Sequence, residues 1–258
     1  MKIEKLKSNQ TSNEILFESC LIKNCSSFDT LLDVYQKFKK NNIGKTVILT
    51  LDDISQAEYT SSHAAMSHNI DDTDGYDLSE VDSVAFEDGE HLGYLSTPSE
   101  FFIRKENFIK QTKNIDFSSA CKRGLKIDEE EMVTLEKINK TPLPYLDEYI
   151  LLKLVPVRNS YEAICGFPNG YFTCDLNPFE NYAVAKYLYE TYNYELFGIG
   201  ASLLGFIRDT PLGEKQAETL VLDVMKLYNS QDSIPNKMID IVKSKNYFFI
   251  KYTESLEF

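Results

Sequence analysis

The chain has 258 residues, of which 43% are hydrophobic and 26% charged, a composition that predicts a globular protein and excludes global disorder. Its 40 acidic and 27 basic residues give a formal net charge of -13, which excludes the basic surface that nucleic-acid-binding proteins normally show. No stretch approaches the roughly 18 apolar residues of a membrane-spanning helix, and the first residues lack the apolar core of a signal peptide. We therefore expect a cytoplasmic protein that binds neither nucleic acid nor membranes.

Five cysteines are present, an odd number in a chain for which no signal peptide is predicted. Such a set fits reduced, mostly buried thiols better than a disulfide framework. Cys20 and Cys25 lack the second pair of ligands that a closed zinc site requires. The remaining cysteines are Cys121, Cys165 and Cys174.

A surface helix is predicted at residues 28–40, because apolar side chains recur there at the spacing of one helical face. Ser26 or Ser27 can cap its start, and Gly44 follows its end. Residues 46–51 form a short apolar run rich in β-branched side chains, which predicts a buried strand ended by Asp52 and Asp53. The helical face consists of Phe28, Leu31, Leu32, Tyr35 and Phe38.

The negative charge of the chain lies in one segment. Residues 52–100, the acidic segment, contain 13 acidic residues and no Lys or Arg. The rest of the chain has 27 acidic and 27 basic residues, so the acidic segment accounts for the whole net charge. It also contains all three histidines, His63, His68 and His91, among clusters of Ser, Thr, Asp and Gly that are typical of loops. We expect a long, solvated loop.

The next stretch is predicted to connect two halves of the chain. Residues 101–104 suggest a strand and residues 106–113 a short helix. Residues 114–142 combine charge with little periodicity, which is typical of a surface connection. Pro142 and Pro144 then favour an extended turn, and we place a domain boundary there.

The boundary separates a smaller α/β N-terminal region, residues 1–143, from a C-terminal α+β domain, residues 144–258. We expect the second range to fold as a unit, because its elements supply a complete apolar set. It begins with a predicted strand at residues 149–155. A helix follows from Pro178 to about Tyr192, with Asn177 as N-cap and Glu180 placed to reach back to it.

Apolar runs at residues 194–199 and 202–207 predict a hairpin. Two helices follow, one at residues 217–228 and one that begins at a Ser233 cap, and residues 247–252 are a closing strand. The order of elements predicts an α+β fold in which helices cover one face of a mainly antiparallel sheet. The helix after Ser233 would bury Ile234, Met238, Ile241 and Val242.

A series of short motifs runs through residues 146–254. They are Leu154-Val-Pro-Val157, Tyr161-Glu162, Gly166-Phe-Pro-Asn-Gly170, Cys174, Asn177-Pro178, Tyr192-Asn-Tyr-Glu195 and the apolar hairpin before Pro211. In their order and spacing this half resembles the bacterial family known as domain of unknown function 4253. The chain departs from that family's usual Trp-rich ending, because residues 246–254 contain Tyr and Phe and no Trp. The resemblance implies a bacterial, intracellular protein and carries over no established activity.

Motifs for nucleotide or metal chemistry are absent from the sequence. No glycine-rich phosphate loop occurs, and the EF-hand register fails at residues 69–75 because it would place Ile70 at the first ligand position. His63 and His68 are five residues apart and lack the i, i+4 spacing of a helical zinc site. We predict no cofactor, no metal site and no catalytic residue, and treat the cysteines as structural rather than nucleophilic.

The favoured function is that of a non-catalytic protein-binding protein. Its contact surface would be the acidic segment, because a surface of one charge attracts a basic partner and raises the association rate. Bacterial immunity proteins are often small and acidic, so toxin neutralisation is one form of this function. The binding residues would be Asp71, Asp72, Asp74 and Asp77.

The alternative function is an enzyme whose site lies between the two halves. Asp52 and Asp53 end a predicted buried strand, which is a usual place for catalytic carboxylates, and the histidines of the acidic segment would assist them. A phosphatase-like arrangement would need a second Asp two residues later, where the chain has Ile54. We favour binding over catalysis.

Overall fold

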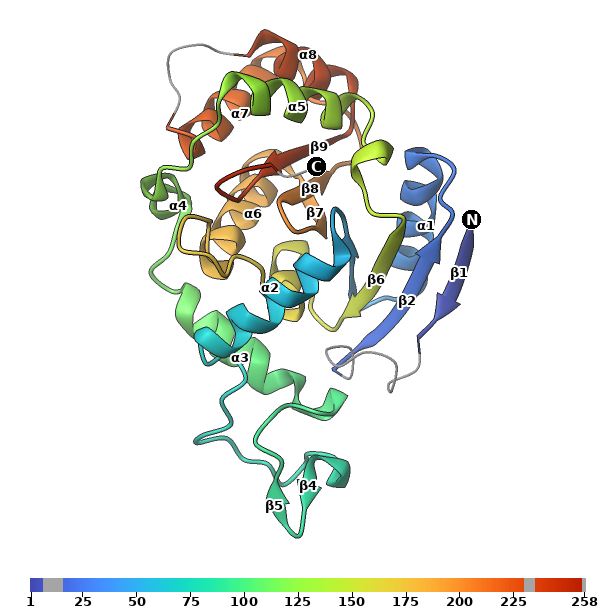
Figure 1. Ribbon diagram of the computed structural model, residues 1–258, viewed down its shortest axis with the longest axis vertical. Helices are drawn as coiled ribbons and strands as arrows, with labels where there is room; N and C mark the ends of the chain where they lie inside the picture. The colour runs from blue at the N-terminus through green and yellow to red at the C-terminus, as the bar shows by residue number, and fades with distance from the viewer. Residues whose placement is uncertain (7–15, 230–234, 257–258) are drawn as a thin grey trace.

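The computed structural model describes residues 1–6, 16–229 and 235–256. Its main sheet has the strand order β1-β2-β6-β3-β7-β8-β9, in which β3 and β7 are parallel and every other neighbouring pair is antiparallel (Figure 1). The predicted α+β class with a mainly antiparallel sheet is confirmed. The strands are β1 (Lys2–Lys5), β2 (Glu18–Lys23), β3 (Thr46–Thr50), β6 (Tyr149–Val155), β7 (Glu195–Ile199), β8 (Leu203–Ile207) and β9 (Tyr247–Lys251).

The two predicted ranges of the chain share this sheet. Strand β6 of the second range lies between β2 and β3 of the first, so that Leu152 is paired with Cys20 on one side and with Leu49 on the other. The boundary at residues 143 and 144 therefore runs through one sheet and one apolar core. Independent folding of residues 144–258 stays a prediction, and in such a fragment β6 would lose both neighbours.

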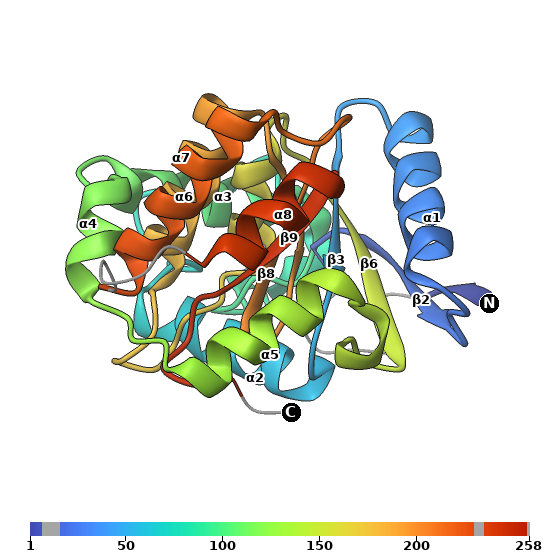
Figure 2. The ribbon, with the colours of Figure 1, turned by 90° about the horizontal axis from the view of Figure 1, so that it is seen from above.

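Helices lie on both faces of the sheet (Figure 2). On one face, Phe28 of α1 (Phe28–Asn41) packs 5.7 Å from Phe249, between ring centroids. The side chain of Phe248 points to the opposite face, where it meets α7 (Glu214–Leu227) and α8 (Asn236–Ser244) beside α6 (Pro178–Tyr192). The helices of the C-terminal range thus share one face, as expected, and α1 covers the other.

The acidic segment is not the long loop that its composition predicts. It contains the helix α2 (Ile54–Ser67), two short 3-10 helices and a small hairpin of β4 (Phe86–Glu87) and β5 (Glu90–His91). The buried face of α2 is made of small side chains such as Ala57 and Ala64, so the helix lacks a strong apolar periodicity. The 3-10 helices are η1 (Ser83–Ala85) and η2 (Pro98–Glu100).

Residues 101–142 are also more helical than predicted. The strand expected at residues 101–104 is wrong, because those residues begin the helix α3 (Phe101–Thr112). The expected surface connection contains α4 (Phe117–Arg123) and α5 (Glu129–Lys140). Capping boxes at Asp116 and Asp128 satisfy backbone N–H groups at the starts of these helices and favour helix despite the high charge.

Other local predictions are confirmed by their hydrogen bonds. The Thr30 N–H donates to the Ser27 hydroxyl at the start of α1. At the start of α6, the Asn177 N–H donates to Oε2 of Glu180, and the amide oxygen of Asn177 accepts from the Glu180 N–H. The predicted hairpin is β7-β8. The Ser233 cap and Ile234 lie outside the described residues, whereas the other three predicted apolar residues of α8 are buried.

The outer edge of β9 is covered by side chains. Asn139 of α5 accepts from the Phe249 N–H and donates to the Phe249 carbonyl, and the Tyr228 hydroxyl makes the same pair of bonds with Lys251. The ammonium of Lys251 binds both oxygens of Glu131 at 2.7 Å and the Glu254 carbonyl at 2.9 Å. The bond to Glu254 holds the tail that follows β9, and the Tyr252 hydroxyl donates to the Ala201 carbonyl at 2.9 Å, which places the start of this tail beside the end of β7.

Candidate functional site: an acidic cleft

A cavity of about 310 Å³ opens where the parallel strands β3 and β7 end. Main-chain pairing continues past both strands, because the Ala201 N–H donates to the Asp52 carbonyl at 3.0 Å. The cavity walls come from the start of α2, the loop before α6, the β7-β8 turn and the tail after β9. Its lining residues, the acidic cleft, are Asp52, Asp53, Gln56, Phe172, Asp175, Ala201, Ser202, Thr253, Glu254 and Ser255.

Asp52 is one of the two buried acids of the cleft and holds the β7-β8 turn. Its Oδ2 accepts from the Ser202 N–H at 2.7 Å and from the Ser202 hydroxyl at 2.6 Å, and its Oδ1 accepts from the Leu203 N–H at 3.2 Å. Burial raises the pKa of Asp52, while these hydrogen bonds oppose the increase. The turn leaves no room for a side chain at Gly200, where a Cβ atom would lie 1.7 Å from Oδ1 of Asp52.

Asp53 is exposed and begins α2. Its backbone has a φ of 35°, a left-handed conformation that Asp tolerates better than most residues. Its Oδ1 accepts from the Gln56 N–H at 3.0 Å and so caps the helix. The neighbouring Ile54 N–H donates to Asp147, which fixes the direction of the helix at the cleft wall. Asp53 therefore combines a capping role with a charge that faces the cavity.

Asp175 and Glu254 come from the two segments that sequence reasoning missed. The Glu254 N–H donates to Oδ1 of Asp175 at 2.9 Å, and the Leu176 N–H donates to the Tyr252 carbonyl at 2.9 Å. Asp175 is only 5% exposed. Burial raises its pKa to about 6, and the Glu254 carboxylate adds to the increase, whereas the Glu254 N–H opposes it. Asp175 can thus change its charge near neutral pH.

The cleft carries four carboxyl groups and no Lys or Arg among its lining residues. One side is bordered by an aromatic rim that runs from Phe172, which lines the cavity and is 48% exposed. Along this rim the ring centroids of Phe172 and Tyr171 are 5.4 Å apart, those of Tyr171 and His63 5.1 Å, and those of His63 and Tyr59 4.2 Å. Four carboxyl groups and the exposed ring of Phe172 thus line one cavity, and both kinds of group attract cations.

The predicted binding residues lie at the other end of α2. Asp71 pairs with Arg104 of α3 through two bonds of 2.6 and 2.5 Å, which compensate its charge. The carboxylates of Asp72 and Asp77 accept from the Asp74 and Ser79 N–H groups. Because α2 has 14 residues, roughly 20 Å of helix separates this loop from the acidic cleft (Figure 1). None of the four predicted residues lines the acidic cleft.

The three histidines are spread along the acidic segment. His63 belongs to the aromatic rim, and the ring of His68 packs 5.0 Å from that of Phe179. His91 binds Oε1 of the fully buried Glu100 through Nε2, at 2.7 Å. The structure therefore brings Asp52 and Asp53 together in one cavity between the two halves, as the enzyme hypothesis requires, but no histidine lines that cavity.

The cysteines differ in exposure, and all five are free thiols. Cys165 is buried, and burial raises the pKa of its thiol to about 12, opposite to the shift of a nucleophilic cysteine. Cys20, Cys25 and Cys121 are partly buried and Cys174 is exposed, so the expectation of mostly buried thiols is wrong. Cys174 stands next to Asp175 but is not part of the cleft lining.

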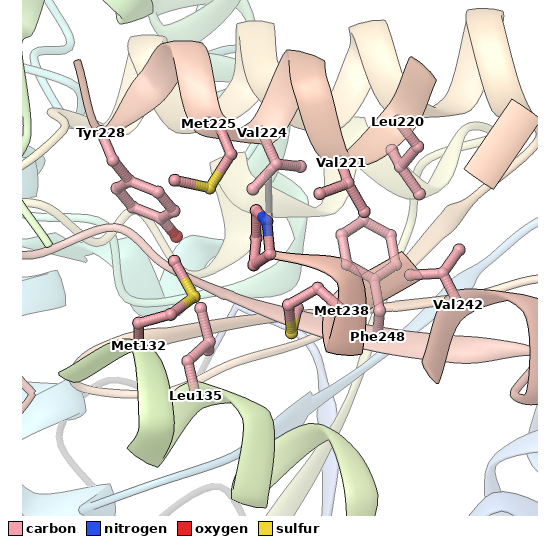
Figure 3. Close-up of a pocket in the computed structure, with 11 residues that line it drawn as sticks. Met132, Leu135, Leu220, Val221, Val224, Met225, Tyr228, Met238, Val242 and Phe248 are labelled. Atoms are coloured by element: carbon pink, nitrogen blue, oxygen red, sulfur yellow. The ribbon is translucent and has the colours of Figure 1, made fainter. Parts of the chain in front are cut away.

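An apolar pocket between α5, α7 and α8 is part of the core rather than a ligand site. Figure 3 shows Met132, Met225 and Met238 in the space between α5, α7 and α8. The free space in this pocket is about 10 Å³, so the side chains fill it. Among the residues that the structure describes, no three His, Cys, Asp or Glu side chains are placed to hold a metal ion. In the same ranges, no helix combines the length and the apolar character needed to cross a bilayer.

No protein-family model matches the chain, and neither the curated proteins nor the solved structures include a significant match. The likeness to domain of unknown function 4253 therefore stays a prediction from the order of motifs, and the case for function depends on the acidic cleft itself.

Proposed function

We propose that the protein binds a basic partner protein and takes a Lys or Arg side chain of that partner into the acidic cleft. The observation that carries this proposal is the gathering of four carboxyl groups, from three separate parts of the chain, around one cavity without a lining cation. This is the protein-binding function expected from the charge of the chain, at a different place on its surface.

The geometry of the cleft supports a cationic side chain as its occupant. Carboxylates on the walls of a cavity focus the negative potential more strongly than the same charges on a convex surface. Phe172 lines the cavity and Tyr171 packs against it, and aromatic rings attract an ammonium or a guanidinium group. The cavity of about 310 Å³ admits one long side chain rather than a folded segment.

A second candidate function is catalysis by the carboxyl groups of the same cleft. It is favoured by the pKa of Asp175, about 6, and by the exposed Asp53 in the same cavity. Two carboxyl groups in different environments are the usual arrangement for a general acid and a general base. Against it, Asp52 has all its hydrogen bonds directed at the β7-β8 turn, which is a structural role.

Titration with short peptides tests the binding proposal. End-blocked trilysine and triarginine should bind in a calorimeter, whereas end-blocked triglutamine should not. Asp53→Asn keeps an N-cap that tolerates the left-handed backbone and removes only the charge, so it should weaken binding about threefold while the melting temperature holds. Binding of triglutamine as tight as that of trilysine would contradict the proposal.

The two functions differ in the fate of the bound ligand. If the cleft is a binding site, a partner recovered from the complex keeps its mass, and Asp175→Asn lowers affinity at pH 7.5. If the cleft is catalytic, the ligand is converted, and Asp175→Asn stops the conversion at nearly unchanged affinity. Mass spectrometry of the ligand before and after incubation separates them.

A further inference from the structure

A second polar cavity, of about 340 Å³, lies between α1, the end of α6 and the outer ends of β7 and β8. It shares no lining residue with the acidic cleft. Its walls come from α1, α6, β7 and β8 and from the connections that follow α6 and β8. The lining residues are Gln36, Lys39, Tyr189, Asn193, Glu195, Ile207, Arg208, Asp209 and Thr210.

Arg208 is the residue of this cavity whose bonding is incomplete. Its backbone N–H donates to the Asn246 carbonyl at 2.8 Å, and its own carbonyl accepts from the Asn246 amide at 3.1 Å, so the base of the side chain is fixed. The guanidinium carbon lies 5.6 Å from the ring centroid of Tyr194. Its Nε is buried and has no hydrogen-bond partner within the described residues. Such a donor is normally satisfied in a folded protein.

The other charges of the cavity leave Arg208 uncompensated. Lys39 and Glu195 form an ion pair with each other, which neutralises both. Asp209 is exposed, and in residues 1–6, 16–229 and 235–256 no carboxylate lies within ion-pair distance of Arg208. Arg208 therefore lines an open cavity with no ion-pair partner among the described residues, and a free guanidinium in such a place attracts an anion.

We propose that this cavity binds a small anion with a carboxylate or phosphate group, held by the guanidinium of Arg208. The planar guanidinium donates two parallel hydrogen bonds to either group. Gln36 and Thr210 line the same cavity and supply neutral polar groups for the remaining oxygens. The ligand that Arg208 would hold is opposite in charge to the one proposed for the acidic cleft, and the two cavities share no lining residue.

Titration with two anions at constant ionic strength tests the site. Inorganic phosphate and succinate are added separately to the full chain, with chloride as the balancing salt, and binding is measured by calorimetry and by the rise in melting temperature. We expect saturable binding of at least one anion; phosphate alone would identify a phosphate site and succinate alone a carboxylate site. Arg208→Gln should abolish the binding. Arg158→Gln, which removes an exposed arginine elsewhere, should leave it unchanged.

A second variant keeps the test decisive if Arg208→Gln fails to fold. Arg208→Lys retains the charge and much of the packing but cannot make two parallel bonds, so affinity should fall about tenfold. Wild-type affinity in Arg208→Lys, or in a folded Arg208→Gln, would overturn the proposal. So would the absence of saturable binding of both anions to the wild-type protein.

Discussion

The molecule has two acidic regions that look alike in composition and differ in structure. In the loop after α2, Asp71, Asp72, Asp74 and Asp77 follow one another closely in the chain. One of them is paired with Arg104, and the carboxylates of Asp72 and Asp77 close local turns. In the acidic cleft, the carboxyl groups belong to residues that are far apart in sequence and line one concave cavity.

The difference shows that charge counted along a chain is a poor guide to charge gathered in space. The loop has more acidic residues per length of chain, but three of its four carboxylates already accept hydrogen bonds from backbone N–H groups or from Arg104. The cleft has fewer acids per residue of chain, but its parallel strand ends and the fixed tail bring them together. This difference is why we propose the cleft, rather than the loop, as the binding surface.

The largest expected effect comes from comparing one glycine in each region. Gly200→Ala would place a Cβ atom 1.7 Å from Oδ1 of Asp52 and 2.5 Å from its backbone nitrogen. We expect the free energy of unfolding to fall by about 3 kcal/mol. Gly75→Ala meets no atom within 4 Å but has a φ of +81°. It should cost only about 1 kcal/mol. Chemical denaturation measures the free energy of unfolding of both variants. Equal losses would contradict the close packing of Gly200 against Asp52.

The second prediction concerns the pH dependence of the cleft. The unfolded carboxyl group of Asp175 ionises near pH 4, whereas burial raises the folded pKa to about 6. The folded state therefore holds the proton more tightly, and its stability falls as pH rises from about 4 to about 6 and stays lower above. Asp175→Asn should raise the free energy of unfolding by at most about 3 kcal/mol at pH 7.5 and by much less at pH 4.

Melts of the wild type and of Asp175→Asn at pH 4 and pH 7.5 check this prediction. Asp77→Asn serves as the control, because that exposed carboxylate accepts a backbone N–H that Asn can also bind. The rise in stability caused by Asp175→Asn should depend on pH, with a midpoint between the unfolded and the folded pKa of Asp175. A gain of the same size at both pH values would show that the Asp175 carboxyl is not buried as described.

The parts of the fold that the sequence predicts are those with local signals. The start of α6 is encoded within four residues, by the Asn177 cap, Pro178 and Glu180. The capping box of Asp128 and Glu131 was equally visible, but the charge of that stretch obscured the helix α5. The helix α2 escaped prediction because Ala and Thr, rather than large apolar residues, form its buried face.

The candidate site was predictable only in its first half. Asp52 and Asp53 end a recognisable strand, so their importance follows from the sequence. Asp175 and Glu254 have no local pattern that links them to that strand. They reach the cleft because β7 pairs with β3 in parallel and because the residues after β9 bond to the loop before α6, where the Leu176 N–H donates to the Tyr252 carbonyl. Such non-local pairing is not visible in a single sequence.

A smaller effect is expected in the loop after α2. Asp71→Asn breaks the two-bond ion pair with Arg104, whose side chain is 12% exposed, against 29% for that of Asp71. The expected loss in the free energy of unfolding is about 1 kcal/mol, because the pair is partly open to solvent. Asp74→Asn removes a carboxylate that makes no hydrogen bond or ion pair within the described residues, and it should change stability by less than about 0.5 kcal/mol. Urea denaturation measures the free energy of unfolding of both variants. Equal losses would show that the ion pair with Arg104 does not contribute to stability.

The most direct measurement compares two double variants that remove the same charge. Asp53→Asn with Glu254→Gln takes two charges from the cleft, and Asp72→Asn with Asp74→Asn takes two from the loop. The association rate and affinity of end-blocked trilysine are measured for both by stopped-flow and calorimetry, at low and at physiological salt. We predict that the cleft variant loses about tenfold in affinity and that the loop variant stays within twofold of the wild type. Equal losses in the two variants, or a larger loss in the loop variant, would contradict the placement of the binding surface at the acidic cleft.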